Sequence, residues 1–376
     1  MQDLDVVVCG GGRTGHLNAV LFKQVPGVRV SLLTTRQDVI ARHQKSPYGL
    51  AALVPDSPPL RARLDTVGHD ATLVANADLV ILTVPAHVRA AWLRGMVQAL
   101  PRDKPVYVGA IPGFCGFDWL AEQILAERPN AVIWGMKDVP HTAYDLHPGV
   151  SVRMGGAKQV LHVGTHAREG ASARTALQRM LQRLYAAPVE LLDHYLEITL
   201  TPGNPIMHSS VVYGLAGPYS QWHERTFPAP VCWWTDCTEL GAYFLARSDE
   251  ENQRLCKAAE QRLGINLSSV KPLHQEIVEA QVRDPRTLLS VLRSNQAYDA
   301  IEAPMVQAVG QPGYVIDKDS RAFQEDVAYG LAVLVEMGRR LDVPLPHIQE
   351  IFDWNVDYMQ GLRGSALDYF PSTWPA

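Results

Sequence analysis

Short apolar runs alternate with longer segments of helical periodicity over the first half of the chain. The runs are rich in Val, Ile and Leu, as buried strands are, and the segments between them repeat apolar residues at the spacing of a helix. We predict strands at 6–9, 28–33, 77–84, 106–110, 131–135 and 189–192. We predict helices at 16–22, 88–100, 117–126 and 172–185. This alternation indicates an α/β fold with a Rossmann-type doubly wound sheet over residues 1–200.

The pattern changes beyond residue 149. Two extended runs, 151–156 and 158–165, have Gly155 and Gly156 near the turn between them and predict an antiparallel hairpin. Beyond residue 200 the strand–helix alternation stops and helical periodicity continues to about residue 360. We therefore expect a second, mostly α-helical domain over residues 201–376.

A glycine-rich turn follows the first predicted strand. Gly10, Gly12 and Gly15 form a G-x-G-x-x-G pattern, with Arg13 and Thr14 between the second and third glycines. Where this spacing lies between a strand and a helix, the first glycine forms a tight turn and the second lets the backbone approach a pyrophosphate. The third allows the helix to pack closely on the strand. The free N–H groups and the dipole of the following helix favour a bound phosphate. A glycine turn without a ligand is the alternative, but the context favours a dinucleotide site that includes Arg13 and Thr14.

The end of the second strand indicates which dinucleotide binds. An acidic residue about 20 positions after the glycine turn would accept from the ribose 2′-hydroxyl of NAD. Here the chain has Thr34, Thr35 and Arg36, and the first carboxylate is Asp38. Hydroxyls and a guanidinium suit a 2′-phosphate, so we expect NADPH. A solvated Arg at a strand end is the alternative.

The strand at 77–84 is the most apolar of the set, and its end is a second candidate contact with the cofactor. Because ligands bind at the carboxyl edge of such sheets, Thr83, Val84 and Pro85 are expected beside the nicotinamide.

Composition and charge narrow the setting. A chain of 376 residues with 47% hydrophobic and 19% charged residues fits a globular protein of two domains. The formal net charge of −5 offers no basic surface for nucleic acid, and five scattered Cys do not indicate a disulfide framework. A strand that starts so close to Met1 leaves no room for a signal peptide, and no apolar run is long enough to cross a membrane. We expect a cytoplasmic protein that binds small molecules, neither nucleic acid nor membrane, with a homodimer as one possible assembly.

A candidate acid/base stands at the start of the helical half. Asn204 is a suitable N-cap and Pro205 a suitable first helical residue, which places His208 in the first turn of a helix. We expect this turn to face the cleft between the domains. Taken alone, a His in such a place is more often structural than catalytic, although it can serve as an acid/base.

A second polar group opens a helix predicted from 320 to about 340. Val327, Leu331, Leu334 and Met337 mark the buried face of this helix. The opening of this helix carries Arg321, Glu325 and Asp326, and Asp326, one turn after Ala322, can lie on the side of the cleft. Acidic residues are also common at solvated helix starts, so this reading stays open. Candidates for lining a substrate pocket are Trp233, Trp234, Arg293 and Tyr314.

These motifs together resemble the opine dehydrogenase family, which includes octopine and nopaline dehydrogenases and the dehydrogenases of opine metallophores. The resemblance rests on the glycine turn, the Asn-Pro-x-x-His helix entry and the Ser-Arg-x-x-x-Glu-Asp helix opening, and covers nearly the whole chain in order. It implies that His208 and Asp326 form a catalytic dyad and that Arg321 holds a substrate carboxylate. Ser209 and Ala322 depart from the Pro and the aromatic residue that many members have there, which affects the expected pocket more than the chemistry.

The resemblance also implies the reaction. The amine of an amino acid condenses with the carbonyl of a 2-oxo acid, water leaves, and hydride from NADPH reduces the imine. His208 would act as proton donor, Asp326 would orient the imidazole, and Arg321 would hold the oxo acid.

Three other functions remain as alternatives. Hydroxyacid and polyol-phosphate dehydrogenases also join a Rossmann domain to helices, but they generally use a Lys near the start of the second domain, and none occurs between Lys158 and Lys257. A redox sensor that binds NADPH without turnover would need no dyad. A metal site at His223, Cys232 and Cys237 matches no usual zinc spacing.

Overall fold

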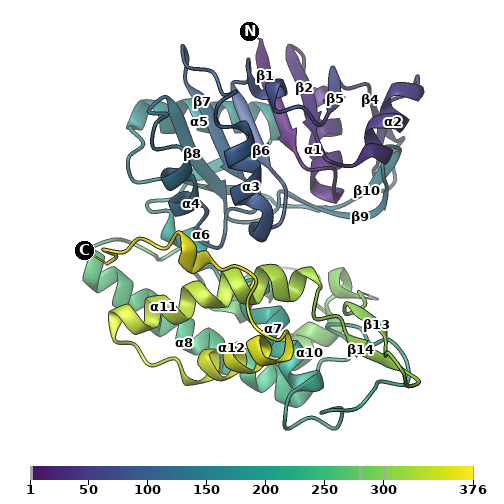
Figure 1. The fold of residues 1–376 in the computed structure, drawn as a ribbon, viewed down its shortest axis with the longest axis vertical. Helices are drawn as coiled ribbons and strands as arrows, with labels where there is room; N and C mark the ends of the chain where they lie inside the picture. Colours follow the sequence, from purple (N-terminus) through teal and green to yellow (C-terminus); the bar gives the residue numbers. More distant parts are fainter. Residues whose placement is uncertain (1–2, 279–281, 300, 376) are drawn as a thin grey trace. The chain divides into compact units, whose positions relative to one another are not determined.

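The computed structural model describes residues 3–278, 282–299 and 301–375. The chain divides into two compact units, Met1–Thr199 and Leu200–Ala376. The first is an α/β unit and the second is mostly helical (Figure 1), which confirms the predicted fold class. Among the described residues, no helix has the length and apolar character needed to cross a membrane.

The first unit is built on an eight-stranded sheet in the order β12-β11-β8-β7-β6-β1-β2-β5. All neighbouring strands are parallel except β11 and β8, which are antiparallel. The strands of this sheet are β1 (Leu4–Cys9), β2 (Val28–Leu33), β5 (Thr66–Gly68), β6 (Leu79–Leu82), β7 (Val106–Ala110), β8 (Ala131–Met136), β11 (Leu161–Thr165) and β12 (Val189–Leu191).

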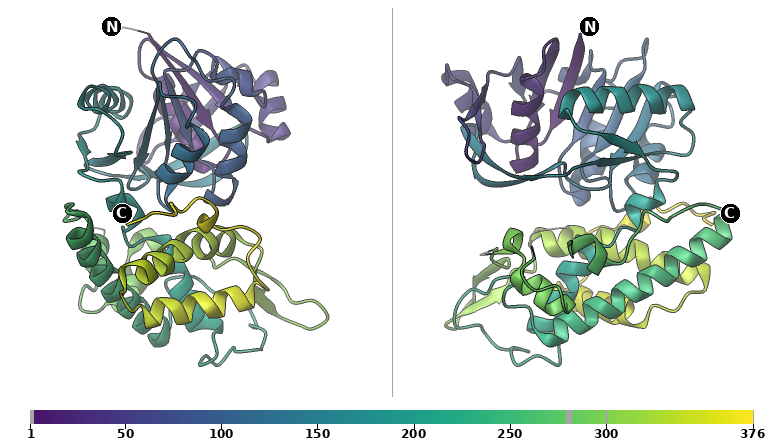
Figure 2. Two further views of the ribbon diagram at one scale, coloured as in Figure 1. Left: turned by 60° about the vertical axis from the view of Figure 1, so that its left-hand side comes forward. Right: turned by 180° about the vertical axis from the view of Figure 1, so that it is seen from behind.

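Helices cover both faces of this sheet. The helices α1 (Arg13–Lys23) and α5 (Ala171–Tyr185) lie on one face of the sheet, which the right-hand view of Figure 2 turns toward the reader. The Phe22 ring of α1 contacts the Tyr185 ring of α5 edge to face, with their centroids 5.0 Å apart. On the other face lie α3 (Ala86–Met96) and α4 (Phe117–Ile124). The remaining helices of the unit are α2 (Gln37–Lys45), the 3₁₀ turn η1 (Ala71–Val74) and α6 (Leu196–Thr199).

The hairpin expected from residues 151–165 is wrong. β10 (Ser151–Ala157) pairs antiparallel with β9 (His141–His147) and parallel with β3 (Leu50–Leu53), in a second sheet of order β4-β3-β10-β9 with β4 at Leu60–Ala62. β11 does not belong to this second sheet; it is a strand of the main sheet. The reason is burial: Leu161 and Val163 of β11 belong to the main core, whereas Gly155 and Gly156 lie inside the irregular end of β10 and make no turn.

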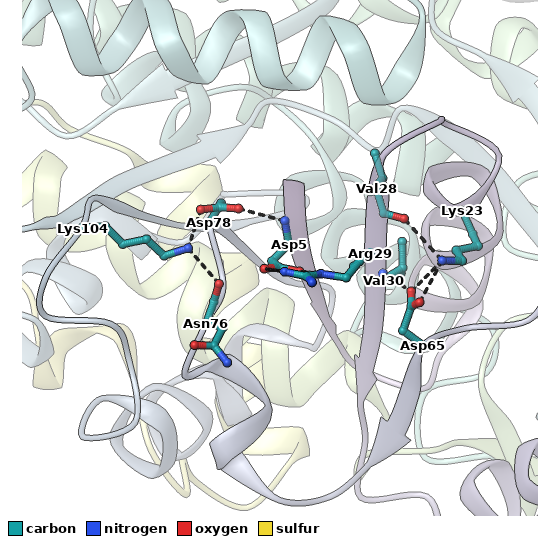
Figure 3. A network of polar contacts seen from close by, with 9 residues as sticks. All are labelled: Asp5, Lys23, Val28, Arg29, Val30, Asp65, Asn76, Asp78 and Lys104. Carbon is teal, nitrogen blue, oxygen red and sulfur yellow. Dashed lines mark hydrogen bonds and ion pairs between the residues drawn. The ribbon is translucent and has the colours of Figure 1, made fainter. Parts of the chain in front are cut away.

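A polar network fastens the amino ends of the main strands (Figure 3). The Asp78 carboxylate accepts from the backbone N–H of Asp5 at 2.8 Å and from Lys104 Nζ at 2.5 Å. Asp5 in turn accepts from Arg29 on the neighbouring strand, and Asp65 accepts from the backbone N–H of Val30 at 2.7 Å. These contacts hold β1, β2 and β6 at the edge opposite the glycine turn, so that the carboxyl edge remains for ligand binding.

The second unit is arranged around α7 (Asn204–Ala216), almost all of which is buried. It packs against α8 (Glu239–Leu263), α12 (Pro346–Tyr358) and the π-helix η3 (Ala322–Leu331). The other elements of this unit are α9 (Leu273–Val278), α10 (Leu288–Ser294), η2 (Gln296–Tyr298), β13 (Met305–Gln307), β14 (Tyr314–Ile316), α11 (Ala332–Leu341) and η4 (Ala366–Asp368).

Two local expectations differ from the structure. Gly203, not Asn204, is the N-cap of α7, and Asn204 is its first residue. The helix predicted from 320 to 340 is π-helical over Ala322–Leu331 before it continues as α11. The predicted buried face is confirmed, because all four of its residues are buried: Val327, Leu331, Leu334 and Met337. An apolar spacing over so few turns does not distinguish an α-helix from the wider π-helix, whose rare turns often occur at functional sites.

A glycine allows α7 and η3 to approach closely. A Cβ added at Gly330 would lie 2.3 Å from Cγ of Pro205, a distance that real side chains do not adopt. The Pro205 ring therefore lies where any other residue at 330 would place its side chain. This contact brings the N-terminal turns of α7 against η3.

We expect Gly330→Ala to lower the free energy of unfolding by about 1–3 kcal/mol, because the added methyl overpacks this contact. Gly95→Ala is the matched control. It lies in α3 with nothing within 4 Å of its added Cβ, so it should leave stability unchanged or slightly raised. Urea unfolding of both variants checks this, and equal effects in the two would contradict the packing role of Gly330.

Candidate active site

The structure brings His208 and Asp326 together within the second unit. His208 Nδ1 lies 2.8 Å from Asp326 Oδ2, although 118 positions separate the two residues in the chain. The His208 side chain is 19% exposed and that of Asp326 only 2%. The pair therefore has a buried carboxylate behind an imidazole that solvent can reach.

The chemistry of the pair follows from this burial. Burial raises the pKa of the Asp326 carboxyl, and the hydrogen bond with His208 opposes that shift. An ionised carboxylate only accepts, so the proton lies on Nδ1 and leaves Nε2 as the second functional atom of the ring. The other carboxylate oxygen, Oδ1, is buried without a hydrogen-bond partner among the described residues. Such a pair can hold one imidazole tautomer and stabilise its charged form.

Arg321 lies near the dyad in sequence and forms an ion pair with Glu325. Glu325 is fully buried, whereas the Arg321 side chain is 55% exposed. The buried carboxylate thus anchors an exposed guanidinium on the same π-helix that carries Asp326. This arrangement offers a fixed positive charge to an anionic ligand.

Two of the four candidate pocket residues lie against His208. The Trp233 ring stacks on the imidazole with centroids 4.6 Å apart, and Trp234 lies at 5.5 Å. Arg293 instead donates to the carbonyl of Cys237, and Tyr314 belongs to β14, where its backbone pairs with Phe227. The structure therefore brings only the two indoles to the dyad.

The glycine turn of the first unit has the geometry that a pyrophosphate needs. A Cβ at Gly15 would lie 1.9 Å from the carbonyl oxygen of Gly10, so α1 packs directly on the turn. A Cβ at Gly12 would meet nothing within 4 Å, which leaves its backbone open to a ligand. Gly12 is the N-cap of α1, and no acidic side chain stands in the first turn, which Arg13 and Thr14 begin. The residues present therefore fit a bound dinucleotide.

The side chains around this turn extend the same site. Thr83 follows β6 and donates its hydroxyl to the carbonyl of Cys9 at 3.0 Å, beside the buried Val84. Pro85 is the N-cap residue of α3. Thr83, Val84 and Pro85 thus stand at the carboxyl end of β6, beside the end of β1.

The end of β2 shows an interaction that the sequence did not indicate. Thr34 is buried and accepts from the backbone N–H of Arg36 at 3.2 Å, while Thr35 and Arg36 are exposed. The Arg36 guanidinium makes a two-pronged contact with Asp38, with Nε–Oδ1 at 3.1 Å and Nη2–Oδ2 at 2.7 Å. This contact lowers the pKa of Asp38. Asp38 therefore holds the cation that was expected to bind the 2′-phosphate.

Two buried side chains near the strand ends, His16 and Arg89, were not identified as part of this site from the sequence. His16 donates from Nδ1 to the carbonyl of Gly12 at 3.0 Å and accepts from the backbone N–H of Gly149 at 2.9 Å. Burial lowers the pKa of His16 to about 4, so it stays neutral and clamps the glycine turn. Arg89 donates to the carbonyls of Val84, Pro112 and Phe114 and so ties together the loops after β6 and β7. The position of His16 directly after the third glycine was the only available signal.

Among the described residues, no group of three or more His, Cys, Asp or Glu side chains could hold a metal ion.

Comparison with known proteins bears on the helical unit first. Residues 191–359 match the family described as NAD/NADP octopine/nopaline dehydrogenase, alpha-helical domain. Over nearly its whole length the chain is 26% identical to octopine dehydrogenase of Mizuhopecten yessoensis, with 93% of this chain and 89% of that protein covered. The chain belongs to the opine dehydrogenase family. It is therefore an NAD(P)-dependent oxidoreductase that acts on CH–NH groups.

Two further comparisons extend this result. The chain is 52% identical over 376 residues to the uncharacterized protein y4xO of Sinorhizobium fredii (strain NBRC 101917 / NGR234), with 99% of each chain covered. Its fold is similar to that of octopine dehydrogenase in a complex described as ODH-NADH-L-Arginine, with a TM-score of 0.81 at 22% identity over 95% of this chain and 90% of that one. The opine dehydrogenase fold thus spans both units.

We expect Gly12→Ala and Gly15→Ala to fail in different ways. Gly15→Ala forces a methyl against the Gly10 carbonyl and should lower the melting temperature of the ligand-free protein. Gly12→Ala meets no protein atom, so it should melt as the parent does but bind dinucleotide at least about tenfold more weakly, because its methyl occupies the pyrophosphate approach. Thermal unfolding and calorimetric titration with NADPH separate the two effects. Parental NADPH affinity in Gly12→Ala would contradict this placement of the cofactor.

Proposed function

We propose that this opine dehydrogenase uses NADPH to condense the amine of an amino acid with a 2-oxo acid. The observation that carries the proposal is the 2.8 Å contact between His208 Nδ1 and Asp326 Oδ2. A buried carboxylate behind a partly exposed imidazole is the arrangement that a general acid needs. The class of substrate is suggested by relatives of the family, including octopine dehydrogenase in complexes described with L-arginine and with pyruvate.

In this proposal His208, Asp326 and Arg321 each stabilise one charge that is present or develops during the reaction. His208 Nε2 gives a proton to the carbonyl oxygen of the oxo acid as the amine attacks and water leaves. Asp326 keeps the proton on Nδ1 and stabilises the charged imidazole. Arg321, anchored by Glu325, binds the carboxylate of the oxo acid.

The cofactor part of the proposal concerns the first unit. The pyrophosphate binds at Gly12 and the N-terminus of α1, and the exposed Thr35 and Arg36 take the 2′-phosphate, while the buried Thr34 supports the turn through its bond with the N–H of Arg36. When bound, the nicotinamide supplies the hydride that reduces the imine, beside Thr83, Val84 and Pro85. Arg13 adds a second positive charge to the adenosine end.

A substrate screen tests the proposed reaction directly. NADPH oxidation is followed with amino acids and with pyruvate, 2-oxoglutarate or glyoxylate, each alone and in pairs. Oxidation that requires both partners supports condensation, and mass spectrometry of the product should then show a secondary amine. Oxidation with an oxo acid alone would instead indicate a hydroxyacid dehydrogenase.

We expect Arg36→Ala to raise the KM for NADPH by roughly 10–100-fold and to leave that for NADH almost unchanged. The reason is the loss of a charge-assisted contact that only the 2′-phosphate makes. Asp38→Asn is the opposing variant: it releases Arg36 and removes a negative charge, so the KM for NADPH should fall. Initial rates with both cofactors check this, and a parent enzyme that uses NADH as well as NADPH would refute the assignment of this strand end.

We expect His208→Ala to lower kcat by about 10²–10⁴-fold while NADPH still binds, because a general acid is lost and the phosphate site is untouched. Asp326→Asn should lower kcat and move the falling limb of its pH profile to lower pH, since the charged imidazole loses its counter-charge. Because the two residues would work as one unit, the double variant should be little worse than His208→Ala alone. Fully additive losses would mean that the residues do not form a dyad.

We expect the loss of Arg321 and the loss of Asp326 to change different kinetic constants, although both residues belong to the same helix region. Arg321→Ala should mostly raise the KM for the oxo acid, because the guanidinium binds the carboxylate in the ground state and the transition state alike. The KM for the amino acid is the internal control. A fall in kcat without any change in the oxo acid KM would remove Arg321 from substrate binding.

A further inference from the structure

The imidazole of His208 rests on a pair of tryptophan rings. It stacks on Trp233 with centroids 4.6 Å apart and planes 22° apart, and it lies 5.5 Å from Trp234 at 31°. The two indoles also stack on each other at 6.1 Å, and Trp234 continues to Tyr298 at 4.9 Å. Both indoles are buried. The face of the imidazole is therefore covered by a continuous aromatic cluster.

The backbone that carries Trp233 is itself held in place. The N–H of Trp233 donates to the carbonyl of Ile301 at 2.9 Å, and the N–H of Ala303 donates to the carbonyl of Val231 at the same distance. The N–H of Cys232 donates to Asp236 Oδ2 at 2.7 Å. An indole mounted on a segment with these contacts is a fixed wall for the imidazole.

The hydrogen bond to Asp326 leaves one degree of freedom of the imidazole undefined. It fixes Nδ1, but the ring can still pivot about that contact and swing Nε2 away from its target. A flat ring stacked at 4.6 Å fixes the plane of the imidazole. That plane, the Nδ1 contact and the covalent bond to Cβ together define the direction of Nε2. We propose that Trp233 is a positioning residue that aims His208 Nε2 at the substrate carbonyl. This inference rests on the acid role proposed for His208.

The indole also acts on the charge of the imidazole. The face of an indole is electron-rich and attracts a cation, so the stack favours the protonated ring in the same sense as the Asp326 carboxylate. Among the described residues, Asp326 is the charged group in contact with the imidazole. Titratable or charged groups on the segments around α7 and Trp233 include Arg321, Glu325, Cys232, Asp236, Cys237, Arg293, Tyr298, Glu302 and Glu350. Arg321 is paired with Glu325, Arg293 donates to a carbonyl, and Glu350 accepts from the Tyr213 hydroxyl.

A purely structural role for Trp233 makes different predictions. A buried indole also fills space, so its removal costs stability wherever it lies. Loss of packing alone would lower the melting temperature without moving a pH profile. Trp222 provides the matched comparison, because it is an indole of the same unit that packs on Phe227 at 5.0 Å and makes no ring contact with His208.

The experiment compares Trp233→Phe, Trp233→Leu and Trp222→Leu with the parent enzyme. Trp233→Leu should lower kcat by roughly 10–100-fold with KM values within about twofold, because aim rather than binding is lost. Its kcat profile should fall at a lower pH, because the protonated imidazole loses the electron-rich face of the indole. Trp233→Phe keeps a flat ring and should recover most of kcat. Trp222→Leu should keep the parental kcat and pH profile at whatever cost to stability.

The NMR signals of the His208 ring protons in the same variants add a readout that needs no turnover. We expect these signals to move in Trp233→Leu, because the ring current of the stacked indole is lost, and to stay at their parental positions in Trp222→Leu. A parental kcat in Trp233→Leu, or an equal loss in Trp222→Leu, overturns the positioning role. If His208→Ala stays active, the proposed acid role fails on its own, while a change in the His208 ring signals of Trp233→Leu would still support the stacking contact.

Discussion

The close approach of α7 and η3 is the constraint on which the candidate active site depends. His208 and Asp326 come from distant parts of the chain, and their 2.8 Å contact requires that α7 and η3 pack closely against each other. Gly330 permits this approach because the Pro205 ring occupies the space that a side chain would need. A larger residue at that point would separate the helices, and a carboxylate buried without its partner would then be costly. The packing of these two helices and the geometry of the His208–Asp326 pair are therefore one requirement in this unit.

The two edges of the main sheet in the first unit carry different kinds of residues. The amino ends of β1, β2 and β6 are tied by carboxylates that accept from backbone N–H groups and from Lys and Arg side chains (Figure 3). The carboxyl ends carry glycines and small hydroxyl side chains, and their loops are held from behind by the neutral His16 and by Arg89. The cofactor edge thus has a defined shape while its polar backbone groups at Gly12 remain open.

At the candidate cofactor and dyad sites, three carboxylates each form an ion pair or hydrogen bond with a basic side chain. Asp38 holds Arg36, Glu325 holds Arg321, and Asp326 holds His208. These pairs differ in burial, and so in strength: the first is solvent-exposed and weak, whereas the carboxylates of the other two are fully enclosed. The exposed Arg36–Asp38 pair is thus easily opened, whereas the buried carboxylates of Glu325 and Asp326 hold their partners in a fixed geometry.

The sequence by itself determined the elements whose signal is local. Continuous apolar runs followed by a glycine turn predicted the Rossmann-type sheet and its dinucleotide site, and the spacing of Val327, Leu331, Leu334 and Met337 predicted a buried helical face. Only the tertiary structure decided which partners these elements meet. β11 joined the main sheet instead of pairing with β10, because register and burial are settled by the whole core. The contacts of His208 with Asp326 and Trp233, and of Arg36 with Asp38, depend on side-chain direction and close packing, which periodicity does not encode.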